Sequence, residues 1–151
     1  MKLGRILNKK LNTAIADMGH GDMLVICDAG FPIPSEAQRI DLAIEQDLPT
    51  IERLMELILS DFCYERVIIS SEMKDYNRPL YDFVVKTCTR CSVEGIPYDE
   101  FMATVPHKAK YIVRSGAFNP YGNIAFISAI DAPKWWNKPG LTVPDVYKDR
   151  V

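Results

Sequence analysis

The chain has 151 residues, of which 48% are hydrophobic and 25% are charged, and its 18 basic and 20 acidic residues give a net charge of −2. This is the size and balance of one globular domain, and it excludes a disordered or fibrous protein. The sequence has no cluster of basic residues that would bind the phosphate backbone of a nucleic acid. No apolar run approaches the roughly 18 residues of a membrane span, and no apolar signal segment opens the chain. We therefore expect a cytoplasmic protein without nucleic-acid or membrane partners.

Helices and strands are predicted to alternate along the chain. Apolar residues recur one turn apart where a helix is expected, and they run without interruption where a strand buried on both faces is expected. In chain order the pattern predicts a helix over 7–18, a strand over Met23–Cys27, a helix over 51–59, a strand over 66–70, a helix over 79–91 and strands over Tyr111–Arg114 and 123–129. Asn8 or Asn12 can cap the first helix, and Thr50 can cap the second. The alternation predicts an α/β fold with a sheet sandwiched between helices.

The composition changes after Ile130. Proline, glycine and polar residues dominate 131–151, which predicts a tail without a helix or strand of its own. The tail carries two adjacent tryptophans, Trp135 and Trp136, which are unfavourable to leave in water. We therefore expect the tail to dock on its own subunit or on a neighbour.

The four cysteines do not predict a metal site. Cys88 and Cys91 form a single C-x-x-C, and zinc would need two further ligands at matching spacing. The two histidines, His20 and His107, lie far apart in the sequence. We expect no metal, and reduced cysteines within a helix are favoured over a redox pair.

Three polar groups lie next to the predicted strands, and in open α/β sheets ligands bind beyond the carboxyl ends of strands. Asp28 directly follows Met23–Cys27, His20 lies between two glycines in the turn before it, and Tyr121 and Asn123 enter the last strand. An imidazole both gives and takes a proton near neutral pH. Each group also has an ordinary explanation, as a surface-turn histidine, a turn-capping carboxylate or an unremarkable turn sequence.

Several short segments, taken together in their order along the chain, indicate a protein family more specifically than any one of them does. These segments are 7–8 (LN), 19–22 (GHGD), 28–34 (DAGFPIP), 39–44 (RIDLAI), 113–116 (VRSG) and 120–124 (PYGNI). Together, over residues 1–130, they resemble the RbsD/FucU family of sugar mutarotases.

The resemblance implies a three-layer α/β/α RbsD-like fold for residues 1–130, followed by a tail over 131–151. It also implies catalysis without a cofactor, and ring-shaped homo-oligomers, often decamers, in which an adjoining subunit completes each sugar site. His20 would be the proton donor. The implied sugar-binding positions are Asp28, Tyr98, Tyr121, Gly122 and Asn123.

Two positions depart from the ribose pyranases of that family. Tyr98 replaces a sugar-binding histidine, and Met102 replaces a lysine commonly found one turn later. His107 is interpreted as an ordinary surface histidine in preference to a ligand-binding one. Other segments resemble two different branches of the family. Residues 28–34 and 39–44 resemble the ribose branch, whereas 18–22 and 121–123 resemble the fucose branch. The sequence therefore does not decide which sugar is the substrate.

The expected activity is that of an isomerase that opens and re-closes the ring of a free monosaccharide. Opening requires only a proton removed from the anomeric hydroxyl and one delivered to the ring oxygen. Re-closure through another hydroxyl exchanges pyranose and furanose, and re-closure on the other face of the carbonyl exchanges anomers. The alternative is a non-catalytic sugar-binding or regulatory protein, in which loss of the histidine at position 98 has ended turnover. The tail is expected to pack at a subunit interface close to the sugar site.

Overall fold

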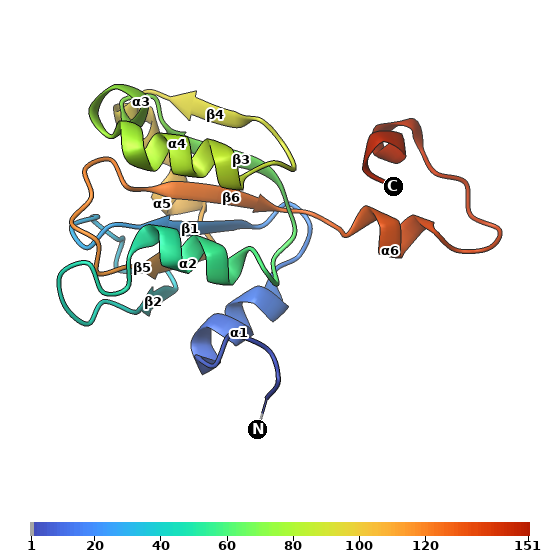
Figure 1. Cartoon of the computed structure of the whole chain (residues 1–151), viewed down its shortest axis with the longest axis horizontal. Helices are drawn as coiled ribbons and strands as arrows, with labels where there is room; N and C mark the ends of the chain where they lie inside the picture. The colour runs from blue at the N-terminus through green and yellow to red at the C-terminus, as the bar shows by residue number, and fades with distance from the viewer. Residues whose placement is uncertain (1) are drawn as a thin grey trace.

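A computed structural model describes residues 2–151, and its core is one six-stranded sheet (Figure 1). The strands are β1 (Met23–Cys27), β2 (Arg39–Asp41), β3 (Tyr64–Ser70), β4 (Val93–Ile96), β5 (Tyr111–Arg114) and β6 (Ile124–Ser128), in the spatial order β2-β5-β1-β6-β3-β4. All neighbouring strands are parallel except that β6 runs antiparallel to both β1 and β3. The last residues of β1 to β5 and the first residues of β6 therefore meet at one end of the sheet, the carboxyl end. The opposite end is called the amino end.

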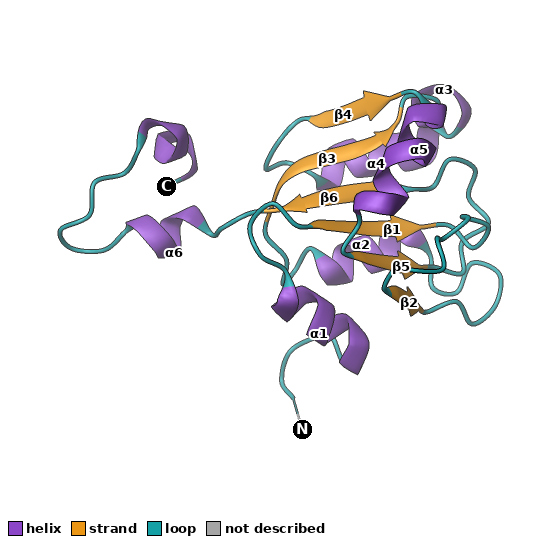
Figure 2. Ribbon diagram, turned by 180° about the vertical axis from the view of Figure 1, so that it is seen from behind, coloured by secondary structure: helices purple, strands orange, loops and turns teal. Residues whose placement is uncertain are grey.

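Helices cover both faces of this sheet. They are α1 (Lys9–Asp17), α2 (Ile51–Ile58), α3 (Met73–Tyr76), α4 (Arg78–Thr87), α5 (Tyr98–Lys108) and α6 (Ala132–Trp136), followed by the 3₁₀ helix η1 (Asp145–Arg150). Figures 1 and 2 show α2 and α4 on one face and α5 on the other. The three-layer α/β/α fold predicted from the sequence is confirmed.

Strand β1 shows why the sequence produces these layers. All five of its residues are buried, but they divide alternately between two cores. Leu24 and Ile26 join the core beneath α1, α2 and α4, whereas Met23, Val25 and Cys27 join the core beneath α5. Successive strand side chains point to opposite faces, so an uninterrupted apolar run is what a sheet covered on both faces requires.

Two of the predicted helix caps form as expected. The Asn8 side chain accepts a hydrogen bond from the Leu11 amide at 3.0 Å, and the Thr50 hydroxyl accepts one from the Arg53 amide at 3.1 Å. Each bond satisfies an amide that the first helical turn leaves without an intrahelical partner.

Two sequence predictions are wrong. The helix predicted over 79–91 ends at Thr87, so Cys88 and Cys91 lie beyond it, because the chain must turn back there to enter β4 beside β3. The tail, predicted without regular structure, forms α6 and η1. Pro133 lies in the first turn of α6, where its fixed φ and missing N–H favour a helix start. Among residues 2–151, no helix has the length and apolar character needed to cross a membrane.

Candidate functional site

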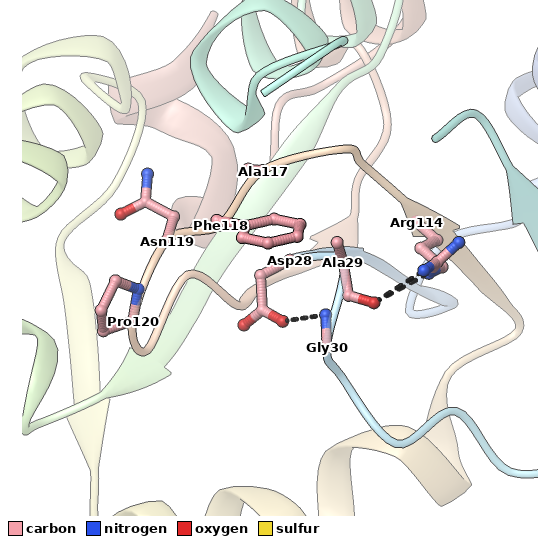
Figure 3. Close-up of a pocket in the computed structure, with 8 residues that line it drawn as sticks. All are labelled: Asp28, Ala29, Gly30, Arg114, Ala117, Phe118, Asn119 and Pro120. Atoms are coloured by element: carbon pink, nitrogen blue, oxygen red, sulfur yellow. Dashed lines mark hydrogen bonds between the residues drawn. The ribbon is translucent and has the colours of Figure 1, made fainter. Parts of the chain in front are cut away.

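A pocket of about 380 Å³ opens at the carboxyl end of the sheet, beyond β1 and β5 (Figure 3). This volume lies in the range of small-molecule sites, roughly 300–1,000 Å³. The residues that line it are Asp28, Ala29, Gly30, Arg114, Ala117, Phe118, Asn119 and Pro120. The pocket is thus mainly apolar with a carboxylate and a guanidinium, a combination that encloses a small polar molecule and orients it.

Asp28 occupies the position directly after β1. Its carboxylate accepts a hydrogen bond from the Gly30 amide at 2.8 Å, and its own amide donates to Asn123 Oδ1 at 3.2 Å. Burial raises the pKa of Asp28, and the hydrogen bonds and the nearby Arg114 offset this only in part. Asp28 therefore caps its turn, as the ordinary interpretation predicted, and also presents a poorly solvated carboxylate to the pocket, a group that gains from accepting a ligand hydroxyl.

The segment before β6 reaches the same end of the sheet because β6 runs antiparallel to β1. Asn77, the cap of α4, donates through Nδ2 to the Pro120 carbonyl at 2.7 Å and to the Asn119 side chain. These bonds tie the loop to the helix. Asn123 is 4% exposed, and its side chain faces the start of the Asp28 turn.

Gly122 has a steric role in this loop. A Cβ there would lie 2.6 Å from Ile51 Cδ1 and 2.7 Å from the Asn119 carbonyl oxygen, both closer than real contacts allow. Its neighbour Tyr121 adopts a φ of 54°, a left-handed conformation that non-glycine residues rarely adopt. A strained backbone conformation of this kind persists only where the surrounding structure holds it in place, and such conformations are frequent at functional sites.

Tyr98 follows β4 and opens α5, so it also reaches the carboxyl end. Its amide donates to Glu72 Oε1 at 3.1 Å. Its ring stands at 90° to that of Tyr121, with ring centroids 5.3 Å apart, and the ring centroid of Tyr76 lies 5.7 Å from that of Tyr121. Burial and the charge of Asp28 raise the pKa of Tyr98. The structure therefore brings Asp28 and Tyr98 together with the loop of Tyr121, Gly122 and Asn123.

His20 lies at the amino end, away from this group. Its turn is held by the Gly21 amide, which donates to the Ser128 carbonyl at 2.9 Å, and Gly21 has a φ of 88° that suits glycine. The imidazole side chain is 41% exposed, and its Nε2 lies 3.0 Å from Glu65 Oε1. Strand β1 separates His20 from Asp28 by roughly 15–20 Å at about 3.3 Å per residue. The sequence analysis grouped His20 and Asp28 as candidates for a site beyond the carboxyl ends of the strands. This is wrong for His20, because the two residues flank opposite ends of β1.

Seven of the eight residues that line the pocket were not assigned a role from the sequence, among them Arg114 and Phe118. Arg114 donates to the Ala29 carbonyl at 3.0 and 2.8 Å and pairs with Asp41 at 3.1 Å, which fixes the pocket wall (Figure 3). Phe118 lines the pocket and is 68% exposed (Figure 3). Arg114 is the last residue of β5, so its position at the carboxyl end could have been inferred once β5 was paired parallel with β1.

Of the predicted site residues, Asp28 alone is among those that line the pocket, and Tyr98, Tyr121, Gly122 and Asn123 are not. The remaining singled-out residues, His107 and Met102, do not line it either. His107 is in the last turn of α5, 3.7 Å from Glu36, and Met102 packs against the core beneath α5. Within residues 2–151, no three His, Cys, Asp or Glu side chains gather in a way that could hold a metal ion.

We expect Asp28→Asn to be at least as stable as the parent near neutral pH, because Asn keeps an oxygen for the Gly30 amide and removes a poorly solvated charge. The raised pKa means that ionising Asp28 destabilises the fold. That penalty is full above the raised pKa and disappears as the pH falls below the unfolded carboxyl value of about 3.9. Urea unfolding at neutral and mildly acid pH should therefore show an advantage of the variant that shrinks with acidification. If the stability advantage of Asp28→Asn grew with acidification, burial would not be what raises the pKa of Asp28.

Comparison with known proteins identifies the family. Residues 1–130 match the RbsD / FucU transport protein family. The chain is 45% identical over all 151 residues to D-ribose pyranase 2 of Rubrobacter xylanophilus, covering 98% of that protein, and 36% identical over its full length to all of D-ribose pyranase 1 of Streptomyces griseus. The structure of Bacillus subtilis RbsD complexed with D-ribose superposes with a TM-score of 0.82 and 32% identity, covering 86% of this chain and 98% of that one. The chain belongs to the RbsD / FucU transport protein family.

Proposed function

We propose that this chain is an isomerase that opens and re-closes the ring of a free monosaccharide by acid–base catalysis, without a metal or organic cofactor. The observation that carries the proposal is full-length similarity to two D-ribose pyranases, combined with a pocket lined by the Asp28 carboxylate and the Asn119 amide. The rings of Tyr98 and Tyr121, which pack on each other, come from the same end of the sheet. Carboxylate, amide and phenol groups are the donor and acceptor types that sugar hydroxyls need.

The chemistry requires two proton movements. The anomeric hydroxyl loses a proton, the bond between the anomeric carbon and the ring oxygen breaks, and the ring oxygen gains a proton. His20 takes the proton from the anomeric hydroxyl and delivers a proton to the ring oxygen, and the reverse transfers accompany ring closure, so the imidazole ends in its starting state. Asp28, Tyr98 and the 121–123 loop hold the other hydroxyls, and the hydroxyl left free to attack decides which ring form is produced.

Within one chain His20 and Asp28 are too far apart to act on one sugar, so His20 of the partner subunit completes each pocket. Exposed apolar side chains beside the pocket support this arrangement: Ile44 is 78% and Phe118 is 68% exposed. Such patches mark protein–protein contacts. The contact joins two different surfaces, and repetition of such a contact closes a ring. A ring-shaped homo-oligomer, with a decamer as one closed form, is the assembly that we infer.

We further infer that residues 1–130 form the catalytic domain and that 131–151 are an accessory tail. The match to Bacillus subtilis RbsD covers nearly all of that chain but only 86% of this one. The tail has its own aromatic contact, between Trp136 and Tyr147 with ring centroids 5.8 Å apart. All four cysteines are free, which fits the reducing cytoplasm in which we place the protein.

Saturation-transfer NMR on ribose, fucose and rhamnose, at neutral pH without added metal, tests the proposed function. We expect the protein to accelerate exchange between ring forms of at least one sugar beyond the spontaneous rate. Binding without accelerated exchange would contradict an enzyme and favour the non-catalytic sugar-binding alternative.

Tyr98→His is expected to shift the sugar preference toward ribose. The tyrosine offers a hydroxyl and an apolar ring face where the ribose pyranases that this chain resembles carry a histidine. The relative exchange rates of the three sugars, measured for parent and variant, check this. An unchanged ranking would remove Tyr98 from the sugar contacts.

A further inference from the structure

We propose that Glu65 is a positioning residue for His20 and that the C-terminal tail, through Arg150, holds Glu65 in place. This inference rests on the proposed function, in which His20 is the proton donor. It assigns a function to the tail, which lies outside the proposed catalytic domain.

Glu65 bridges the histidine turn and the tail. One carboxylate oxygen, Oε1, lies 3.0 Å from His20 Nε2, and the other, Oε2, lies 2.9 Å from Arg150 Nη1. The Glu65 side chain is 23% exposed, so solvent competes for it less than for a surface carboxylate. Both oxygens are thus engaged, and the carboxylate has little freedom to turn away from the imidazole.

A β-bulge directs Glu65 toward His20. Tyr64 pairs with Ser128 and Arg66 pairs with Ile127, so Glu65 is the extra residue of β3 between two consecutive pairs. Bulges re-aim a side chain and are frequent beside active sites. Ser128 also accepts the Gly21 amide hydrogen bond at 2.9 Å. The last residue of β6 therefore sets the position of both partners.

The tail reaches back to this place through η1. Arg150 ends η1, and its guanidinium lies 5.9 Å from the centroid of the Tyr147 ring, which in turn packs on Trp136. Arg150 also lines a hollow of about 290 Å³ with Glu65 and the start of α6. Figure 1 shows α6 and the chain end projecting from the amino end of the sheet, on the side where β6 ends. The aromatic contact thus holds the end of the chain beside Glu65.

This arrangement defines what each nitrogen of His20 does. Burial raises the pKa of Glu65, but hydrogen bonds from Arg150 and His20 outweigh it and hold the pKa below its usual value. An ionised Glu65 only accepts hydrogen bonds, so Nε2 carries the hydrogen and Nδ1 is left to exchange a proton with the sugar. The other ionisable groups around Glu65 include Arg66 on its own strand, which pairs with Glu94, and Cys91. Cys63, Tyr64, Arg90 and Asp149 line the same hollow as Glu65.

Nitrogen-15 NMR of the imidazole rings tests the positioning directly, since the chain has only two histidines. In the parent at a pH where the ring is neutral, we expect His20 to show the single tautomer protonated at Nε2. Glu65→Ala should give a tautomer mixture and slow ring exchange by roughly 10–100-fold, the usual effect of removing a group that orients a functional histidine. The loss should fall on kcat and leave KM unchanged.

Arg150 is tested by rescue. Arg150→Ala should reproduce part of both effects, and Arg150→Lys, which keeps the charge, should restore them toward the parent. Glu36→Gln is the matched control: it alters the carboxylate beside His107 and should change only the His107 signals. Circular dichroism and light scattering establish that each variant folds and assembles.

A Glu65→Ala variant with the parent's tautomer and exchange rate would overturn the role of Glu65. A higher KM with an unchanged kcat would also contradict positioning. An Arg150→Ala variant identical to the parent would overturn the role of the tail. If the parent itself exchanged no sugar, the proposed function would fail, while the nitrogen spectra would still decide whether Glu65 and Arg150 fix His20.

Discussion

Replacing His20 with alanine is expected to slow ring exchange by about 10²–10⁴-fold, the usual contribution of a positioned acid–base group. The fold should persist, because the side chain is 41% exposed and lies in a turn held by backbone bonds. Saturation-transfer NMR gives the rate, and thermal unfolding gives the stability.

His107→Ala is the control for this variant, since His107 lies outside the pocket against Glu36. It should keep the parent's exchange rate, and a chelator should leave both proteins unaffected. An undiminished rate in His20→Ala would remove His20 from the mechanism. A clear loss on chelation would point instead to a metal.

Gly122→Ala is expected to destabilise the protein by about 1–3 kcal/mol, the usual effect of an overpacked interior. The added Cβ would press on Ile51, which is fully buried, and on the Asn119 carbonyl, so the loop must move. Because Tyr121 and Asn123 flank Gly122, ring exchange should fall as well.

Gly30→Ala is the matched control for stability, because a Cβ at Gly30 meets only Asp28 Oδ1 at an ordinary 3.5 Å. Urea unfolding of the two variants and the parent gives the comparison. Equal stability of Gly122→Ala and the parent would show that the loop relaxes, and that Gly122 has no steric role.

The strands with uninterrupted apolar runs were predictable from the sequence. Strands β1 and β5 were predicted residue for residue, and β6 within one residue at each end, because central strands covered on both faces need such runs. The outer strands β2 and β4 were missed. Residues of β2 alternate exposed and buried, and β4 has no fully buried residue, so neither leaves an apolar run.

The site was predictable only in part, because strand direction does not follow from the local pattern. The polar residues next to β1 and β6 were correctly singled out, but only the antiparallel pairing of β6 with β1 explains why Asn123 meets Asp28. Because His20 precedes β1 and Asp28 follows it, His20 lies at the amino end of the sheet. Glu65 gave no signal in the sequence, since its aim depends on a bulge in the register of β3 with β6.

The most direct test of a sugar site shared between subunits is to mix two variants with slowed ring exchange. We expect Asp28→Asn, like His20→Ala, to slow ring exchange when tested alone, because it removes the carboxylate proposed to hold a sugar hydroxyl. The two variant chains are unfolded and refolded together, with refolded parent as the reference. In random mixed rings, about a quarter of the contacts join an intact pocket to an intact His20 of the partner subunit, so we expect recovery of about a quarter of the parent's exchange rate. A mixture no faster than its two components, in rings shown to contain both chains, would contradict the shared site.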